Sequence, residues 1–184
     1  MKIKNTLIAA LLLLCFACST ETKTVTVKRE KYSIELPDYL SETSILNEEA
    51  SLQYQNLLKQ FFVIALDESK TELQEALLAN GLEDDYSFDL EGYSELMIEN
   101  FREFVGLGGI PDFTETTING MRAFTVDIEG TIDGEVIYWK VAYIEGKNNF
   151  YQLLVWTGGT KKKQYEEQMQ DVINSFRETD KSRN

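Results

Sequence analysis

The sequence predicts an α+β fold in which helices cover both faces of one central antiparallel sheet, forming a three-layer α/β/α sandwich. The second half of the chain contains strand segments joined by Asn119-Gly120 and Asp133-Gly134, two-residue turns that are typical of antiparallel hairpins. In the segment Val136 to Ile144 both alternating sets of side chains are largely apolar, whereas an antiparallel sheet with one wet face alternates cleanly. The sequence also predicts three helices with apolar faces, which supply the two covering layers.

The first 17 residues have the pattern of a secretion signal. Two lysines precede the apolar run Leu7 to Phe16, and Ala17 is a small residue suited to signal-peptidase cleavage. The run is too short to be a permanent membrane span, which needs about 20 residues. Cys18 comes next, and the segment Cys15 to Cys18 resembles the bacterial lipobox, although Cys15 stands where leucine is usual. The resemblance implies that Cys18 becomes the lipid-modified, palmitate-bearing N-terminus.

These boundaries divide the chain into a lipoprotein signal peptide (1–17), a lipidated N-terminus and tether (18–30), one domain (31–178) and a flexible tail (179–184). Cleavage leaves 167 of the 184 residues, a length that fits one domain with a real core. Within the tether, the polar and β-branched stretch that begins at Thr22 leads into the first predicted strand.

Composition excludes several kinds of function. The sequence has no histidine, which removes the commonest general base and imidazole-ligated zinc. The mature chain keeps 16 basic and 31 acidic residues, a net charge of −15 that repels nucleic-acid phosphates. The acidity is concentrated in residues 42–103, which carry a net charge of −12.

The sequence of the first half of the domain predicts three strands and a first helix, followed by a second helix. Tyr32 to Leu36 alternates with period two, and strands are also expected at Ser51 to Gln55 and Gln60 to Leu66. In the last of these, both alternating sets are apolar, with Phe61 facing one side and Phe62 the other. A capping box at Ser69 to Glu72 and Asn80-Gly81 bound the first helix.

The second helix follows Ser87 or Asp89. Its apolar stripe consists of Leu90, Tyr93, Met97, Phe101 and Phe104. Gly92 should weaken this helix by about 1 kcal/mol relative to alanine. The glycines between Gly106 and Gly109 are expected to end it.

A meander and a third helix complete the domain. Strands are predicted at Phe113 to Ile118, Met121 to Glu129, Val136 to Ile144 and Phe150 to Trp156. The last helix carries an apolar face formed by Tyr165, Met169, Val172, Ile173 and Phe176.

This order of elements resembles the PsbP-type fold. The resemblance rests on a strand ending in Leu36-Pro37, an early hairpin, two central helices, a meander ending in Tyr151 to Thr157 and a last helix ending in Ile173 to Phe176. That superfamily includes an extrinsic photosystem II subunit, a Ran-binding import factor and DcrB-type bacterial envelope lipoproteins. The resemblance covers residues 32–176 and implies a domain that binds other proteins and has no shared catalytic residues.

One acidic strip is a candidate partner-binding site. Glu91, Glu95, Glu99 and Glu103 recur every four residues, opposite the apolar stripe of the second helix. Each like-charge pair at this spacing destabilises an isolated helix by about 0.2–0.5 kcal/mol. The strip is either a recognition surface for a basic partner or a divalent cation, or the solvated face of an acidic protein, and the second interpretation is favoured.

Three further groups have alternative interpretations. The carboxylates of Glu83, Asp84, Asp85 and Asp89 could bind calcium, but a solvated loop with a helix N-cap is favoured. Lys161, Lys162 and Lys163 at the start of the last helix could contact lipid head groups, although pairing with nearby acids is favoured. Aromatic residues of the last two strands could line a ligand cleft or simply pack in the core: Tyr138, Trp139, Tyr143, Tyr151 and Trp156.

We therefore expect a lipid-anchored protein of the bacterial cell envelope that binds another envelope protein and is not an enzyme. Ser19 is not aspartate, which favours the outer membrane if the host is Gram-negative. The alternative is a module that binds a small ligand or a divalent cation, and a carboxylate-based hydrolase is third. No metal site and no cofactor are predicted. The sequence does not indicate the identity of the partner or the oligomeric state.

Overall fold

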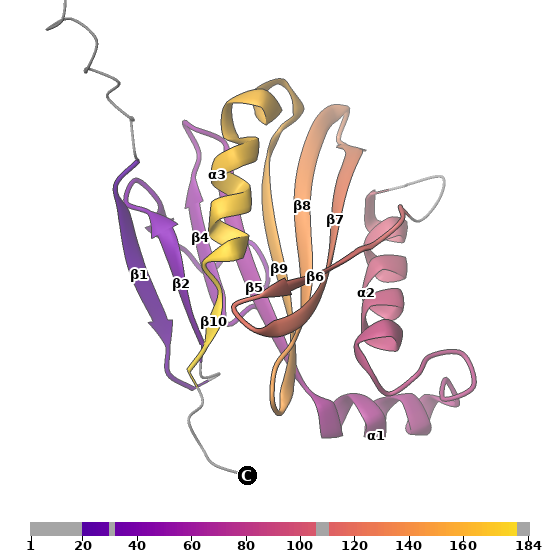
Figure 1. Cartoon of the computed structure of the whole chain (residues 1–184). Helices are drawn as coiled ribbons and strands as arrows, with labels where there is room; N and C mark the ends of the chain where they lie inside the picture. The colour runs from indigo at the N-terminus through magenta and orange to yellow at the C-terminus, as the bar shows by residue number, and fades with distance from the viewer. Residues whose placement is uncertain (1–19, 30–31, 106–110, 180–184) are drawn as a thin grey trace, which may run out of the picture.

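The computed structural model describes residues 20–29, 32–105 and 111–179, which form two antiparallel sheets and three α-helices (Figure 1). The small sheet has the order β1-β2-β10, with β1 (Thr22–Val27), β2 (Tyr32–Pro37) and β10 (Arg177–Glu178). The central sheet has the order β3-β4-β5-β9-β8-β7-β6, with β3 (Ser41–Glu42), β4 (Leu52–Asn56), β5 (Phe61–Ser69), β6 (Thr114–Ile118), β7 (Met121–Ile132), β8 (Glu135–Glu145) and β9 (Asn149–Gly158). The helices are α1 (Lys70–Asn80), α2 (Leu90–Val105) and α3 (Lys162–Asn174), and a 3₁₀ turn (Gly159–Lys161) precedes α3.

The local signals in the sequence predict the turns and caps correctly. Asn119 and Gly120 both have positive φ (48° and 88°), as do Asp133 and Gly134 (51° and 84°), and a type I′ turn requires this. Ser69 caps α1, because its hydroxyl accepts a hydrogen bond from the Glu72 amide at 3.4 Å. These turns and this cap fix the register of β6 to β8 and the point where β5 gives way to α1.

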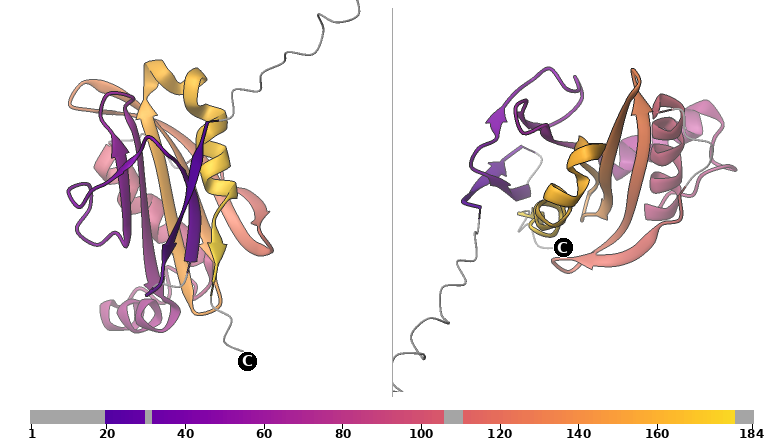
Figure 2. Two further views of the ribbon diagram at one scale, coloured as in Figure 1. Left: turned by 90° about the vertical axis from the view of Figure 1, so that its left-hand side faces the viewer. Right: turned by 90° about the horizontal axis from the view of Figure 1, so that it is seen from above.

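Over β5 and β9, one face of the central sheet is covered by α3 and the small sheet (Figure 2), whereas Asp127 and Glu129 of β7 on the same face are exposed. Phe61 of β5 has no exposed surface and meets Tyr165 of α3 edge to face, with ring centroids 5.4 Å apart. Tyr32 of β2 stacks on Phe176, which follows α3, at 5.0 Å. This aromatic packing joins the two sheets through α3.

The other face of the central sheet is covered by α1 and α2 (Figure 2). Leu73 and Leu77 of α1 are buried, and Tyr93 of α2 stacks on Phe150 of β9 at 4.9 Å. Helix α2 packs over β7 and β8. The three-layer α+β prediction is therefore confirmed, although this second layer leaves part of β5 and β9 open, as described below.

Two predictions require correction. Residues 22–27 of the predicted tether form strand β1, because their alternate residues Val25 and Val27 pack against the core while the backbone pairs with β2. Phe104, placed on the apolar stripe of α2, is 71% exposed. The buried side of the helix instead includes Ile98 and Val105, because α2 is rotated relative to the predicted stripe.

In the part of the chain that the structure describes, no helix is both long enough and apolar enough to cross a membrane.

Candidate functional site: a groove and an acidic strip on helix α2

An apolar groove of about 590 Å³ lies between α2 and the loop before β4. Its floor consists of alternate residues of β5, β9 and β8 with the end of β7: Phe62, Ile64, Leu66, Gln152, Leu154, Trp156, Ile137, Trp139 and Ile132. The rings of Phe62 and Trp156 stack at 5.1 Å with an interplanar angle of 11°. Because strand side chains alternate between faces, this floor is the second of the two apolar sets that the sequence predicts.

Helix α2 forms one wall of the groove and the loop at Leu46 and Asn47 forms the other. The helix contributes Met97, Asn100, Phe101 and Phe104. Phe101 meets Trp139 of the floor edge to face at 5.3 Å, so this wall is anchored to the sheet. The exposed Phe104 at the rim gives the groove an apolar lip.

The buried side chain of Gln53 holds the opposite wall in place. Its Oε1 accepts hydrogen bonds from the amides of Leu46 (2.9 Å) and Asn47 (3.1 Å), and its Nε2 donates to the Asn47 carbonyl (2.6 Å). These three bonds satisfy a side chain that is only 7% exposed. The groove is therefore bounded on both sides by anchored elements and is largely preformed.

Beyond one end of the groove stands a carboxylate with an altered pKa. Glu68 lies two residues after Leu66 in β5, so its side chain is on the same face of the sheet. Burial raises the pKa of Glu68, and the neighbouring carboxylates of Glu72, Glu49 and Asp67 raise it further. The charged form is thus disfavoured in the folded protein.

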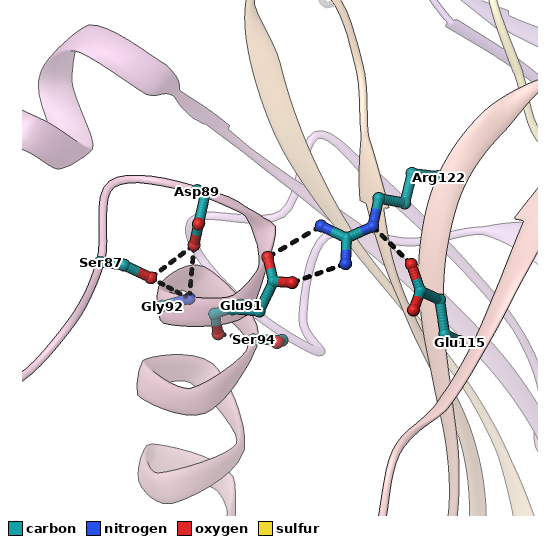
Figure 3. Close-up of polar contacts among 7 residues, drawn as sticks. All are labelled: Ser87, Asp89, Glu91, Gly92, Ser94, Glu115 and Arg122. Carbon is teal, nitrogen blue, oxygen red and sulfur yellow. Dashed lines mark hydrogen bonds and ion pairs between the residues drawn. The ribbon is translucent and has the colours of Figure 1, made fainter.

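The acidic strip lies on another side of α2, and its first member is paired with arginine. Figure 3 shows Glu91 of α2 and Glu115 of β6 on opposite sides of the guanidinium of Arg122. Arg122 donates two hydrogen bonds to Glu91, at 2.5 and 2.8 Å, and one to Glu115 at 2.6 Å. The hydrogen bonds from Arg122 lower the pKa of Glu91. A cation from the β6–β7 hairpin therefore neutralises this end of the strip.

The other members of the strip differ from one another. Glu99 is paired with Arg102, three residues further along α2, and the pKa of its carboxyl is lowered by those hydrogen bonds. Glu95 is exposed, and the side chain of Glu103 is outside the described residues. Glu95 and Glu99 line a cleft of about 420 Å³ with Asp112 and several apolar residues. Among the described side chains of the strip, Glu95 is the one without an ion pair.

The loop before α2 acts as a helix cap, as favoured by the sequence. The Gly92 amide is shared between the Asp89 carboxylate (3.2 Å) and the Ser87 hydroxyl (3.1 Å), as Figure 3 shows. A Cβ at Gly92 would lie 2.0 Å from the Ser87 carbonyl oxygen, so glycine is required here rather than merely tolerated. No cluster of three or more potential metal ligands occurs in the described segments.

The aromatic residues of the last two strands divide between the two interpretations. Tyr138, Tyr143 and Tyr151 are buried core residues. Trp139 and Trp156 instead line the groove. The sequence did not predict the position of this groove. A signal for it was present: the apolar surface formed by β5 and β9 is larger than one helix can cover. Cys18, the predicted lipid site, and Gly106 to Gly109 lie outside the described residues.

Comparison with known proteins supports the fold. No protein-family model and no curated protein matches the sequence. The structure is similar to that of the cyanobacterial PsbP protein CyanoP from Synechocystis sp. PCC 6803, with a TM-score of 0.59 and 7% identity over 89% of this chain and 95% of that one. It is also similar to the Ran-binding protein Mog1p of Saccharomyces cerevisiae, with a TM-score of 0.52 and 13% identity over 88% and 97% of the two chains. The chain therefore has a PsbP-like fold.

Proposed function

We propose that this protein is a non-catalytic binding module, held on a bacterial envelope membrane by lipid at Cys18, whose groove beside α2 receives apolar side chains of another envelope protein. The observation that carries the proposal is the groove itself, an apolar hollow of about 590 Å³ with an exposed phenylalanine at its lip. In protein complexes, the side chains that contribute most of the binding energy fill well-packed, desolvated pockets.

Several features favour binding over chemistry. The sequence has no histidine to act as a general base near neutral pH. The carboxylates of Glu91 and Asp127 are engaged by Arg122 and Lys140, as expected for structural ion pairs. The groove is lined mainly by carbon, and its polar side-chain groups are the amides of Asn47, Asn100 and Gln152 and the indole N–H groups of its two tryptophans, none of which is a general base or a nucleophile.

The energetics require contacts beyond the groove. Each apolar side chain transferred from water contributes about 1.5–3 kcal/mol. Association costs at least about 4 kcal/mol in lost freedom, and a Kd of 1 μM needs about 8 kcal/mol net. Two or three side chains in the groove are therefore insufficient, and the partner must also contact the surface around it.

We assign that second contact to the acidic strip, which a partner reaches by extending from the groove across α2, with basic residues of the partner as its counterpart. Glu95 is the member best placed to accept a new cation, because Glu91 and Glu99 already have arginine partners. Replacing Glu95 with glutamine should weaken partner capture and reduce its dependence on salt. Glu75→Gln on the exposed side of α1 is the matched control.

Site-specific crosslinking in intact cells tests the proposed function. A photoreactive phenylalanine analogue replaces Phe104 at the groove lip, or Phe88, which is 44% exposed but outside the groove. We expect a discrete protein adduct from position 104 that is absent at position 88. The same adduct from both positions, or none from position 104, would contradict the assignment of the groove to a protein partner.

The lipid anchor is tested separately. Cys18→Ser should abolish labelling by a fatty-acid probe, whereas Cys15→Ser should retain it. Stable attachment needs more than one acyl chain, so the labelled parent should behave as an integral membrane protein. Labelling that persists in Cys18→Ser and is lost in Cys15→Ser would move the anchor to the other cysteine.

A small apolar ligand is the second candidate occupant, favoured by the three amide groups that reach the groove. The two tryptophans of the chain, Trp139 and Trp156, both line it, so tryptophan emission, excited selectively over the nine tyrosines, reports on the groove. Native mass spectrometry of the purified protein should detect such a ligand, and its removal should change the tryptophan emission. A protein that carries no ligand and gives the position-104 adduct favours the protein partner.

A further inference from the structure

The described chain begins at one end of the domain, beside the start of α3. Thr20 lines a cleft together with Lys59 of the β4–β5 turn and Gln164 of α3. Figure 1 shows β1 starting at the end of the molecule where α3 begins, and α1 lying at the opposite end. Cys18 is two residues before Thr20, and two extended residues span at most about 7 Å. A lipid on Cys18, as in the proposed function, therefore holds this end next to the bilayer.

Three exposed apolar side chains lie at this end. Leu57 and Leu58 of the β4–β5 turn are 68% and 94% exposed. Lys161, just before α3, donates hydrogen bonds to the carbonyls of Leu58 and Lys59, both at 3.2 Å, so the turn is fastened to the start of the helix. Val136, 53% exposed, is next to Gly159 at the same end.

The same end carries lysines in an otherwise acidic protein. Lys59 and Lys161 to Lys163 gather at the turn and the start of α3, where positive charge opposes the helix macrodipole. Lys162 is paired with Glu129 at 2.7 Å, and Lys163 is exposed. Lys161 holds the turn and Lys162 has a carboxylate partner, but core packing and helix capping explain neither the solvated leucines nor the exposed Lys163.

We propose that this end, defined as Leu57, Leu58, Lys59 and Lys161 to Lys163 and called here the basal end, docks on anionic lipid head groups. The lysines bind phosphates while Leu57 and Leu58 enter the interface. The exposed carboxylates of Asp133 and Glu135 at the same end reduce the attraction, whereas acidic groups farther from the lipid than the Debye length, about 8 Å at physiological ionic strength, are screened. The lipid anchor raises the local concentration of the basal end at the membrane.

Depth-dependent quenching tests the proposal in the lipidated protein. Both cysteines of the chain lie in the signal or at the lipid site, so Leu58→Cys introduces a unique thiol for a fluorescent label. Leu78→Cys is the matched control, because Leu78 is 50% exposed on α1 at the opposite end. The proteins are placed in vesicles of zwitterionic phospholipid with or without an anionic phospholipid.

We expect a lipid-borne quencher to reach the label at position 58 and not at position 78, with stronger quenching when anionic lipid is present. Each of Lys59→Gln, Lys161→Gln and Lys163→Gln should shift the docking equilibrium about fivefold toward the undocked state. Equal quenching at positions 58 and 78, or quenching indifferent to anionic lipid, would overturn the proposal. A failure of the Cys18 anchor would be seen separately, as protein that does not float with either kind of vesicle.

Discussion

Phe61 and Phe62 are adjacent in β5 and face opposite sides of the central sheet, so they form a matched pair for testing which face is closed. Phe61 has no exposed surface and contacts Tyr39 and Tyr165 at centroid distances of 6.1 and 5.4 Å. Truncating such a side chain costs about 3–5 kcal/mol, because it removes burial and leaves a cavity. Phe62 is only partly buried and stacks on Trp156 in the open groove, so Phe62→Ala should cost about 1–2 kcal/mol, mainly the lost stacking and partial burial.

Urea unfolding of Phe61→Ala and Phe62→Ala measures the two losses through the midpoint at unchanged m. Phe62→Ala should also alter tryptophan emission in the native state, since Trp156 loses its stacking partner, while Phe61→Ala should not. Equal losses of about 3–5 kcal/mol from both variants would show that the groove face is as closed as the α3 face. That result would refute the groove and with it the proposed function.

Three further changes have defined outcomes. Gly92→Ala should destabilise the fold by more than about 1 kcal/mol despite the better helix propensity of alanine, since its Cβ meets the Ser87 carbonyl; a thermal melt equal to the parent's would show that the cap shifts freely. Glu68→Gln should stabilise the protein at neutral pH. The pKa of Glu68 is higher in the folded than in the unfolded protein, so the charged carboxylate lowers the stability of the parent as the pH rises through the folded pKa. The gain should disappear in melts below the unfolded pKa of about 4.3. Arg122→Ala should cause a small loss of stability at neutral pH, and this loss should vanish as pH falls through the lowered pKa of Glu91; a loss independent of pH would exclude the ion pair as its cause.

Local signals account for what the sequence predicted well. Turns such as Asn119-Gly120 and the capping box at Ser69 act within a few residues, so their effect can be read from adjacent letters. Alternation in β5 also predicted correctly that both faces are apolar. The alternation could not predict where α2 crosses the sheet, because the position of a helix depends on packing between distant segments. The groove lies where α2 no longer covers β5 and β9.

The acidic strip shows the same limit. Its spacing placed four glutamates on one side of a helix, but the partner of Glu91 is Arg122, thirty-one residues away in sequence and brought close by the β6–β7 hairpin. The cost expected from like charges along α2 is thus offset by a tertiary contact. The strand β1 is a second example. The alternating β-branched residues of 22–27 are typical of a strand, but β1 forms because Val25 and Val27 pack against a core made by other segments, which cannot be seen in the sequence of this segment alone.

The position of the groove relative to the basal end links the two proposals. Phe62 follows the β4–β5 turn almost directly, and Ile132 immediately precedes the Asp133-Gly134 turn, so this end of the groove lies on the basal side of the domain (Figure 1). A domain docked through Leu57 and Leu58 would hold Phe62 and Phe104 close to the membrane surface. A partner anchored in the same membrane then meets the groove at an effective concentration in the millimolar range for short tethers. Under that condition the groove and the acidic strip together need contribute less than in solution, because the shared membrane has already restricted the freedom that association would otherwise have to remove.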